Sequence, residues 1–340
     1  MKTLTTLSLC LVLQAQALTI IRNQLPGDPG TNDFGGGNLP AIFNHACDIW
    51  EQAIQDDFTL TLDYGWAPVG GGTHTMTGYS NGRETSGLIQ FNNDNVLGHH
   101  HFYIDPEPWN SDEYLDYGEV VNSTLGGIPI NTHRTYFNPK PEALSFAHVD
   151  LLTVAVHEIG HALGISDAHP LFQADKLDGY LTITNGPYAG SAVLLAANNF
   201  GYTSHLDLAG PAMGRGLYHT KRTLPSALDV LVLAHISGWQ KLNFELAPAL
   251  VITQDSLSWF SPLSYVPQWS AGEEWLDVEG SRMAGGLWTL DLVCDDEMKL
   301  YRLSRPVAGP VAGPVPDLMP FNWLATVPVC SECGWQGDWK

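Results

Sequence analysis

The stretch that decides the fold runs V-D-L-L-T-V-A-V-H-E-I-G-H-A-L-G-I-S-D, from position 149 to 167. Within it, His157, Glu158 and His161 form the pattern H-E-x-x-H. The apolar run over 151–156 predicts the buried part of a helix. On a helix, residues i and i+4 lie on one face, one turn apart, so the imidazoles of His157 and His161 would lie side by side and could bind one metal ion.

This pattern is typical of zinc metalloproteases, in which the two histidines bind the metal and the glutamate acts as general base. Glu158 directly follows the first ligand and can reach a metal-bound water without binding the metal itself. A helix that merely happens to carry these groups is the alternative, but it would bury polar side chains without partners, which is costly. Gly164 could take the left-handed conformation and end the helix. The sequence therefore predicts a zinc site on this helix.

The third zinc ligand is less well determined by the sequence. A catalytic zinc ion usually has three protein ligands and one open position for water. Asp167 lies six residues after His161, where the compact motif H-E-x-x-H-x-x-G-x-x-H has its third histidine, and a carboxylate can bind zinc. His205, in the stretch S-H-L-D-L-A-G-P-A-M-G, is the other candidate. From the residues alone, both alternatives stay open.

The stretch H-E-I-G-H-A-L-G at 157–164, followed later by a methionine turn, resembles the metzincin zinc endopeptidases. In the leishmanolysin-like branch, an insertion separates the glycine from a third histidine nearer the methionine, and the segment 204–239 is similar to that branch. Asp167 departs from this pattern and is similar to the aspartate ligand of snapalysin-like enzymes. The resemblance is closest to secreted bacterial proteins of leishmanolysin-like or matrixin-like type. It implies the ligands His157, His161 and His205, the general base Glu158, and Met213 as the methionine beneath the metal.

The order of the other predicted elements suits an α+β domain. Apolar residues recur at helical spacing over 39–54 and 226–239, and they predict a helix in each segment. Ser226 and Asp229 resemble a capping box at the start of the second helix. Strands are expected over 58–64, 87–92 and 101–104, with a turn at 70–72. The metzincin resemblance implies a twisted sheet over the zinc-binding helix and a C-terminal helix.

Four regions are predicted along the chain: a signal peptide (1–17), a zinc metallopeptidase catalytic domain (18–243), a small all-β, sandwich-like module (244–306), and a Pro/Gly linker with a C-x-x-C tail (307–340). The first region has a basic start, an apolar stretch and an A-Q-A cleavage site. No later stretch is long and apolar enough to span a membrane. The doubled V-A-G-P of the last region favours a spacer over a helix or a central strand.

The chain is strongly acidic, with a formal net charge of −21 at pH 7. This charge argues against nucleic acid and against anionic membranes as partners. Some aspartates could hold calcium, so Ca2+ is a further cofactor to consider beside Zn2+. We expect a monomer that is secreted to the extracellular space, the periplasm or the cell surface.

Other histidines and cysteines carry weaker patterns. The triplet H-H-H at 99–101 could be a second metal site, but a solvated strand end is the preferred interpretation, because adjacent residues of a strand point to opposite faces. His235, inside an apolar helix, is interpreted as a core histidine. Cys330 and Cys333 form a C-x-x-C that could be half of a metal site, and a structural disulfide is preferred because export permits it.

Together these features predict a secreted zinc endopeptidase that acts on protein or peptide substrates. The metal would polarise the scissile carbonyl, and Glu158 would take the proton of the attacking water and pass it to the leaving amine. Two alternatives stay open: a non-peptidase zinc amide hydrolase, and an adhesive or binding protein with a structural zinc. Glu158 argues against the second, because a closed structural site has no use for a base beside the metal.

Overall fold

A computed structural model describes most of the predicted catalytic domain. The described residues are 18–32, 34–93, 101–114, 116–120, 123–138, 148–215 and 221–246, followed by separate strand segments between 250 and 327. The predicted signal peptide at 1–17, the V-A-G-P repeats at 307–316 and the C-x-x-C at 330–333 lie outside the described residues.

The described residues form a mixed α+β structure. Its helices are α1 (Leu39–Ala53), α3 (Leu151–Leu163), α4 (Pro170–Asp175) and α5 (Ala227–Ser237), with a short 3-10 helix, η2 (Lys176–Asp178). Three of these confirm the predicted helices at 39–54, 226–239 and the H-E-x-x-H segment. None of the described helices combines the length and apolarity that a membrane crossing requires.

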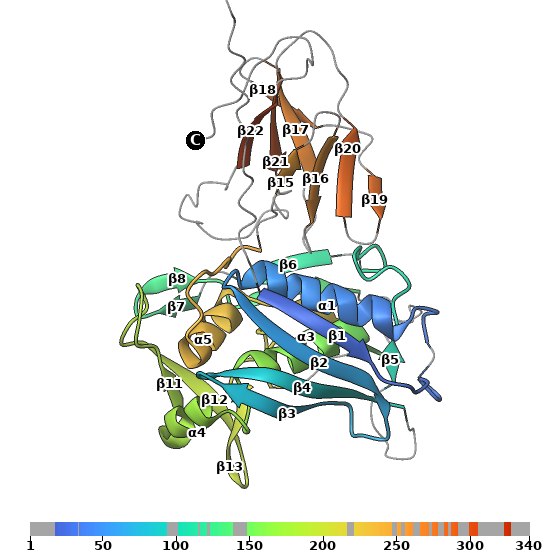
Figure 1. Ribbon diagram of the computed structural model, residues 1–340. Coiled ribbons are helices and arrows are strands. Elements are labelled where there is room, and N and C mark those ends of the chain that lie inside the picture. The colour runs from blue at the N-terminus through green and yellow to red at the C-terminus, as the bar shows by residue number, and fades with distance from the viewer. Residues whose placement is uncertain are drawn as a thin grey trace, which may run out of the picture.

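The main sheet has four strands, β1 (Leu18–Gln24), β2 (Phe58–Ala67), β3 (Gly72–Ser80) and β4 (Arg83–Asn92), in the order β1-β2-β4-β3. The first three in this order run parallel, and β3 is an antiparallel edge strand. Helices α1 and α3 pack together and cover one face of the sheet (Figure 1). The predicted strands at 58–64 and 87–92 are confirmed and are longer than expected. The predicted turn at 70–72 is one residue too long, because Gly72 already begins β3.

Smaller sheets complete this part of the chain. They are the pair β5 (Phe102–Tyr103) and β10 (Val149–Asp150), the sheet β6 (Asp116–Val120), β9 (His133–Phe137) and β14 (Lys221–Leu224), the hairpin β7 (Ser123–Leu125) and β8 (Ile128–Ile130), and the sheet β11 (Tyr180–Thr182), β12 (Ala192–Asn198) and β13 (Gly201–Leu206). The strand predicted at 101–104 is thus only the two-residue β5. The last sheet lies in the segment between α3 and Met213.

The C-terminal strands form two further four-stranded sheets. One contains β15 (Leu250–Ile252), β16 (Ser256–Phe260), β20 (Leu287–Asp291) and β19 (Arg282–Ala284), and the other contains β18 (Glu274–Asp277), β17 (Val266–Ala271), β21 (Lys299–Ser304) and β22 (Trp323–Val327). The expected all-β composition is therefore observed. The predicted boundary at 306 is too early, since β22 pairs antiparallel with β21 after the V-A-G-P segment.

The core of the described domain is centred on the contact between α1 and α3. Trp50 on α1 is fully buried, and its indole Nε1 donates a hydrogen bond to the carbonyl oxygen of Val156 on α3 over 2.9 Å. All thirteen residues of α3 are buried. A helix that is buried on all sides must pack against several neighbours. Helix α3 accordingly packs against α1 and against the main sheet.

We predict that Trp50→Ala destabilises the domain by about 3–5 kcal/mol, because it leaves a cavity between the two helices and removes the indole donor. Urea unfolding followed by the helical circular dichroism signal measures this change. The matched control is Asn44→Ala on the exposed side of α1, which should change stability by less than about 0.5 kcal/mol. Equal effects of the two substitutions would contradict the central position of the α1–α3 contact.

Candidate metal centre

Helix α3 has defined ends. At its start, the carboxylate of Asp150 accepts hydrogen bonds from the backbone N–H (3.0 Å) and the hydroxyl (2.8 Å) of Thr153. At its end, Gly164 has φ 157° and ψ −41°. The predicted stop is therefore in place, but the left-handed conformation expected for Gly164 is wrong. A side chain is excluded there all the same, because a Cβ would lie 2.8 Å from Oγ of Ser237.

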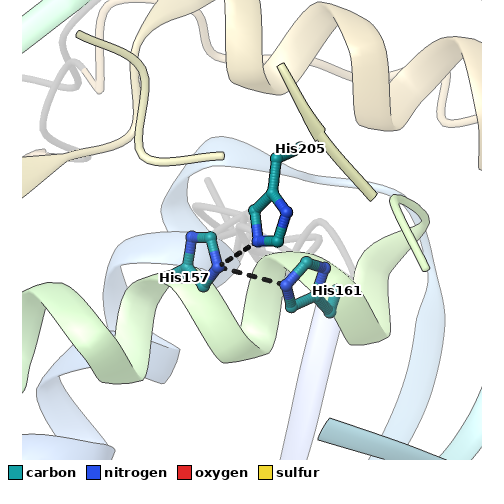
Figure 2. A group of neighbouring side chains, drawn as sticks. All are labelled: His157, His161 and His205. Carbon is teal, nitrogen blue, oxygen red and sulfur yellow. Dashed lines mark hydrogen bonds between the residues drawn. The ribbon is translucent and has the colours of Figure 1, made fainter. Parts of the chain in front are cut away.

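Three histidine side chains converge above α3 (Figure 2). Nε2 of His157 lies 3.1 Å from Nε2 of His161 and 3.2 Å from Nε2 of His205. Within the described part of the chain, this is the one group of at least three His, Cys, Asp or Glu side chains placed to hold a metal ion. The predicted pair on the helix and the predicted distant histidine thus meet at one point.

The outer nitrogens of the helix histidines are held by backbone carbonyls. Nδ1 of His157 lies 2.7 Å from the carbonyl oxygen of Ala212, and Nδ1 of His161 lies 2.5 Å from that of Ile165. A carbonyl can only accept, so each Nδ1 carries the proton and each Nε2 presents a lone pair to the centre. Burial lowers the pKa of His157 to about 4 and also lowers the pKa of His161 and His205. All three imidazoles are therefore neutral at pH 7, which is the form that binds a metal.

The donor set fits zinc. Three neutral imidazoles supply nitrogen ligands, which zinc accepts in tetrahedral geometry, and three protein ligands leave one position for water or substrate. The carbonyl contacts of His157 and His161 are the outer-shell support that metal-binding histidines usually have. A calcium ion prefers oxygen ligands, so this group does not fit calcium.

Glu158, the residue after His157 on α3, is buried and is not a member of the histidine group. Burial raises the pKa of its carboxyl to about 8. Strand β3 passes so close that a Cβ on Gly72 would lie 2.4 Å from Oε1 of Glu158. The glycine therefore makes room for the glutamate between the helix and the edge strand.

Met213, which the metzincin resemblance implies as the methionine beneath the metal, packs against α3 at Gly160. Its side chain is fully buried, and a Cβ on Gly160 would lie only 2.2 Å from its sulfur. The turn that carries Met213 is held by Asp229 of α5, whose carboxylate accepts hydrogen bonds from the backbone N–H of Ala212 (3.0 Å) and of Met213 (2.8 Å). The same carboxylate closes the predicted capping box with Ser226. The sequence predicted the capping box but not this second role.

The structure places His205, and not Asp167, in the histidine group. His205 lies on β13, and the next residue, Leu206, donates its N–H to the carbonyl of Met213 over 2.8 Å. The side chain of Asp167 is 60% exposed, and its Oδ1 forms an ion pair with Lys176 Nζ over 2.7 Å. The strand that leads into the methionine turn thus carries the third histidine.

Comparison of the chain with models of known protein families, with curated proteins and with solved structures finds no match.

Two other histidine predictions have different outcomes. Of the triplet at 99–101, only His101 is among the described residues; its ring contacts those of Phe34 and His148, and it is not in the metal group. His235 was interpreted as a core histidine rather than a ligand, and it does lie outside the metal group. It is only partly buried, and its Nε2 lies 2.8 Å from a carboxylate oxygen of Asp175 on α4, a partner that the sequence of its own helix could not reveal.

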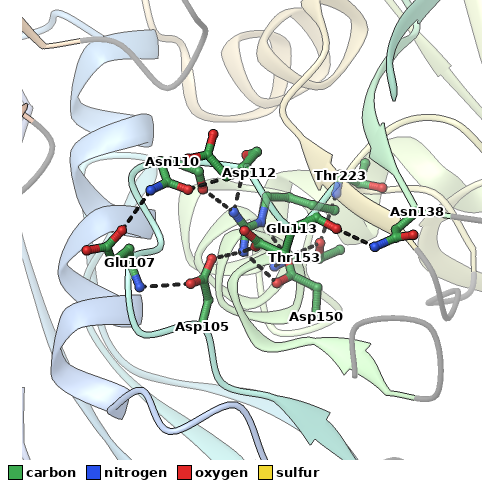
Figure 3. Close-up of polar contacts among 11 residues, drawn as sticks. Asp105, Glu107, Asn110, Asp112, Glu113, Asn138, Asp150, Thr153 and Thr223 are labelled. Atoms are coloured by element: carbon green, nitrogen blue, oxygen red, sulfur yellow. Dashed lines mark hydrogen bonds and ion pairs between the residues drawn. The ribbon is translucent and has the colours of Figure 1, made fainter. Parts of the chain in front are cut away.

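A second buried polar cluster fixes the start of α3 (Figure 3). The guanidinium of Arg222 on β14 lies 2.5 Å from Asp105 and 3.1 Å from Asp150, and all three side chains are almost fully buried. Glu113 lies 3.0 Å from the same guanidinium, and burial raises its pKa to about 8. Since Asp150 also caps α3, Arg222 ties the loop after β5, the strand β14 and the metal-site helix together.

We predict that the chain binds one zinc ion, and that His205→Ala raises the Kd for zinc by more than about a hundredfold, beyond what loss of an outer-shell partner costs. Competition with a chromogenic chelator measures the Kd. Asp167→Ala is the matched comparison, since it removes the other predicted ligand; it should stay within about twofold because an exposed ion pair contributes little. A larger rise in the Kd for zinc with Asp167→Ala than with His205→Ala would assign the third ligand to Asp167.

We also predict that Arg222→Leu destabilises the domain by about 3–5 kcal/mol, because it leaves buried carboxylates without their counter-charge. The control is Arg215→Leu, which removes an arginine that is 64% exposed and pairs with Asp207 over 3.1 Å; it should cost less than about 1 kcal/mol. Urea unfolding of both variants measures the difference, and similar losses would show that the Arg222 cluster does not anchor the helix.

Proposed function

We propose that this chain is an exported zinc endopeptidase of metzincin type, which hydrolyses peptide bonds in protein substrates. The observation that carries the proposal is the convergence of three neutral imidazole nitrogens, from His157, His161 and His205. Glu158, the residue after His157 on α3, contributes a buried carboxyl group. A structural zinc site usually has four protein ligands, whereas a catalytic one has three and an open position. The described group has three.

The residues divide into ligands and a base. His157, His161 and His205 would hold the zinc ion, and when bound it would supply a Lewis acid for the scissile carbonyl and lower the pKa of its water toward about 7. Glu158 would take the proton of the attacking water and deliver it to the nitrogen of the leaving amine.

The surrounding fold supports the same proposal. The edge strand β3 passes Glu158 and is antiparallel to its neighbour β4, and the methionine turn contacts α3 at Gly160 and His157. Helix α5 follows and holds that turn through Asp229. The order sheet, zinc helix, methionine turn and closing helix is the one that the metzincin resemblance implies.

We predict that Glu158→Gln lowers the rate of protein cleavage by about 10²–10⁴-fold, the usual contribution of a general base, while the zinc content stays unchanged. The assay is hydrolysis of a denatured protein by the zinc-loaded chain, with and without a chelator. Glu107→Gln, away from the histidines, is the matched control and should keep full activity.

The outcomes separate the competing functions. Chelator-sensitive cleavage that Glu158→Gln loses supports the endopeptidase. Cleavage of small amides but of no protein would favour the non-peptidase zinc hydrolase. A chain that binds zinc tightly, cleaves neither kind of substrate and behaves identically after Glu158→Gln would overturn the enzymatic proposal in favour of a binding protein.

A further inference from the structure

A buried histidine–glutamate pair lies in the hairpin of β3 and β4. Nε2 of His74 is 2.8 Å from Oε1 of Glu84, and the two side chains expose only 2% and 0% of their surface. A Cβ on Gly87 of β4 would lie 2.2 Å from Oε1 of Glu84 and 3.2 Å from Nε2 of His74. The hairpin therefore has a glycine at the position where a side chain would break this contact.

The pair borders the metal centre. The ring of His74 lies nearly parallel to the ring of His161, at 25°, with 6.4 Å between the centroids. Gly72, two residues earlier on β3, abuts Oε1 of Glu158. Residues i and i+2 of a strand point to the same face. On β3, Gly72 therefore faces the proposed base Glu158, and His74 faces the proposed ligand His161.

A role in stability alone explains this pair poorly. Burying two ionisable groups costs as much as or more than their attraction returns, and an apolar pair of similar size is often at least as stable. The other oxygen of the carboxylate, Oε2 of Glu84, is buried and has no hydrogen-bond partner. An unsatisfied buried oxygen costs free energy, so stability alone does not account for a pair whose histidine ring lies beside His161.

We propose that His74, anchored by Glu84, is a positioning residue of the metal centre. Its ring packs beside His161 and keeps that imidazole in the orientation in which Nε2 faces the other two histidines. Glu84, on the neighbouring strand β4, holds the His74 side chain in place across the hairpin. The ring of His74 separates the buried carboxylate of Glu84 from the proposed ligand His161. A negative charge in such a low-dielectric surrounding favours the binding of a cation. The inference rests on one part of the proposed function, namely that the three histidines bind zinc.

The test is the zinc affinity of His74→Phe, which keeps an aromatic ring and removes the anchor. We expect the Kd for zinc in chelator competition to rise about tenfold, the lower end of the effect of losing an outer-shell partner. His235→Phe is the matched control, because His235 and Asp175 form another histidine–carboxylate contact of 2.8 Å, between α5 and α4. The control should leave the Kd within about twofold.

Glu84→Gln is the second variant, because it keeps the shape of the side chain and removes its charge. It should also weaken zinc binding, and with saturating zinc both variants should lower kcat more than they change KM. If His74→Phe fails to fold by circular dichroism, Glu84→Gln decides the question. Variants that lower only the melting temperature of the zinc-free protein, with the Kd for zinc unchanged, would overturn the positioning role.

The readouts distinguish this inference from the proposed function. A chain that binds zinc but cleaves no protein would refute the endopeptidase, while the effect of His74→Phe on the Kd would still decide the positioning role. A chain that binds no zinc would refute both.

Discussion

The carboxylate of Asp229 is the group on which the metal centre depends. It is fully buried and accepts hydrogen bonds from the N–H groups of Ala212 and Met213, while it caps α5 through Ser226. The carbonyl of Ala212 in turn faces Nδ1 of His157. A single side chain thus fixes the turn under the helix and, through one peptide group, the tautomer of a proposed ligand. Without this contact, the lone pair of His157 would not be directed to the centre.

The start of the same helix is fixed by a different charge cluster. Asp150 caps α3 and also faces Arg222, so the helix cannot shift along its axis without breaking a buried ion pair. Such pairs add little net stability, but removing one partner is very costly. The metal-site helix is therefore held at its start by Arg222 and supported from below by the methionine turn, and the histidine spacing follows from these two restraints.

How much could be predicted from the sequence depends on how local each contact is. His157, Glu158 and His161 lie within one turn of one helix, so their arrangement follows from helix geometry. His205 came from the family resemblance, because its neighbours on α3 are more than forty residues away. Strand β3 was missed because it is a partly exposed edge strand with few large apolar residues. The partner of His235 was missed because Asp175 belongs to another helix, which the pattern of α5 cannot reveal.

The absence of side chains at three glycines explains how so many polar groups fit around one point. Gly160 admits the sulfur of Met213, Gly72 admits the carboxylate of Glu158, and Gly87 admits the contact of His74 with Glu84. At each position a Cβ would come within 2.4 Å of the neighbouring group. These glycines lie in a helix and in strands, where glycine is otherwise unfavourable. The cost in backbone entropy is thus offset by close packing around the proposed metal centre. This packing brings Met213, Glu158 and the His74–Glu84 pair against the backbone of α3 and of the β3–β4 hairpin.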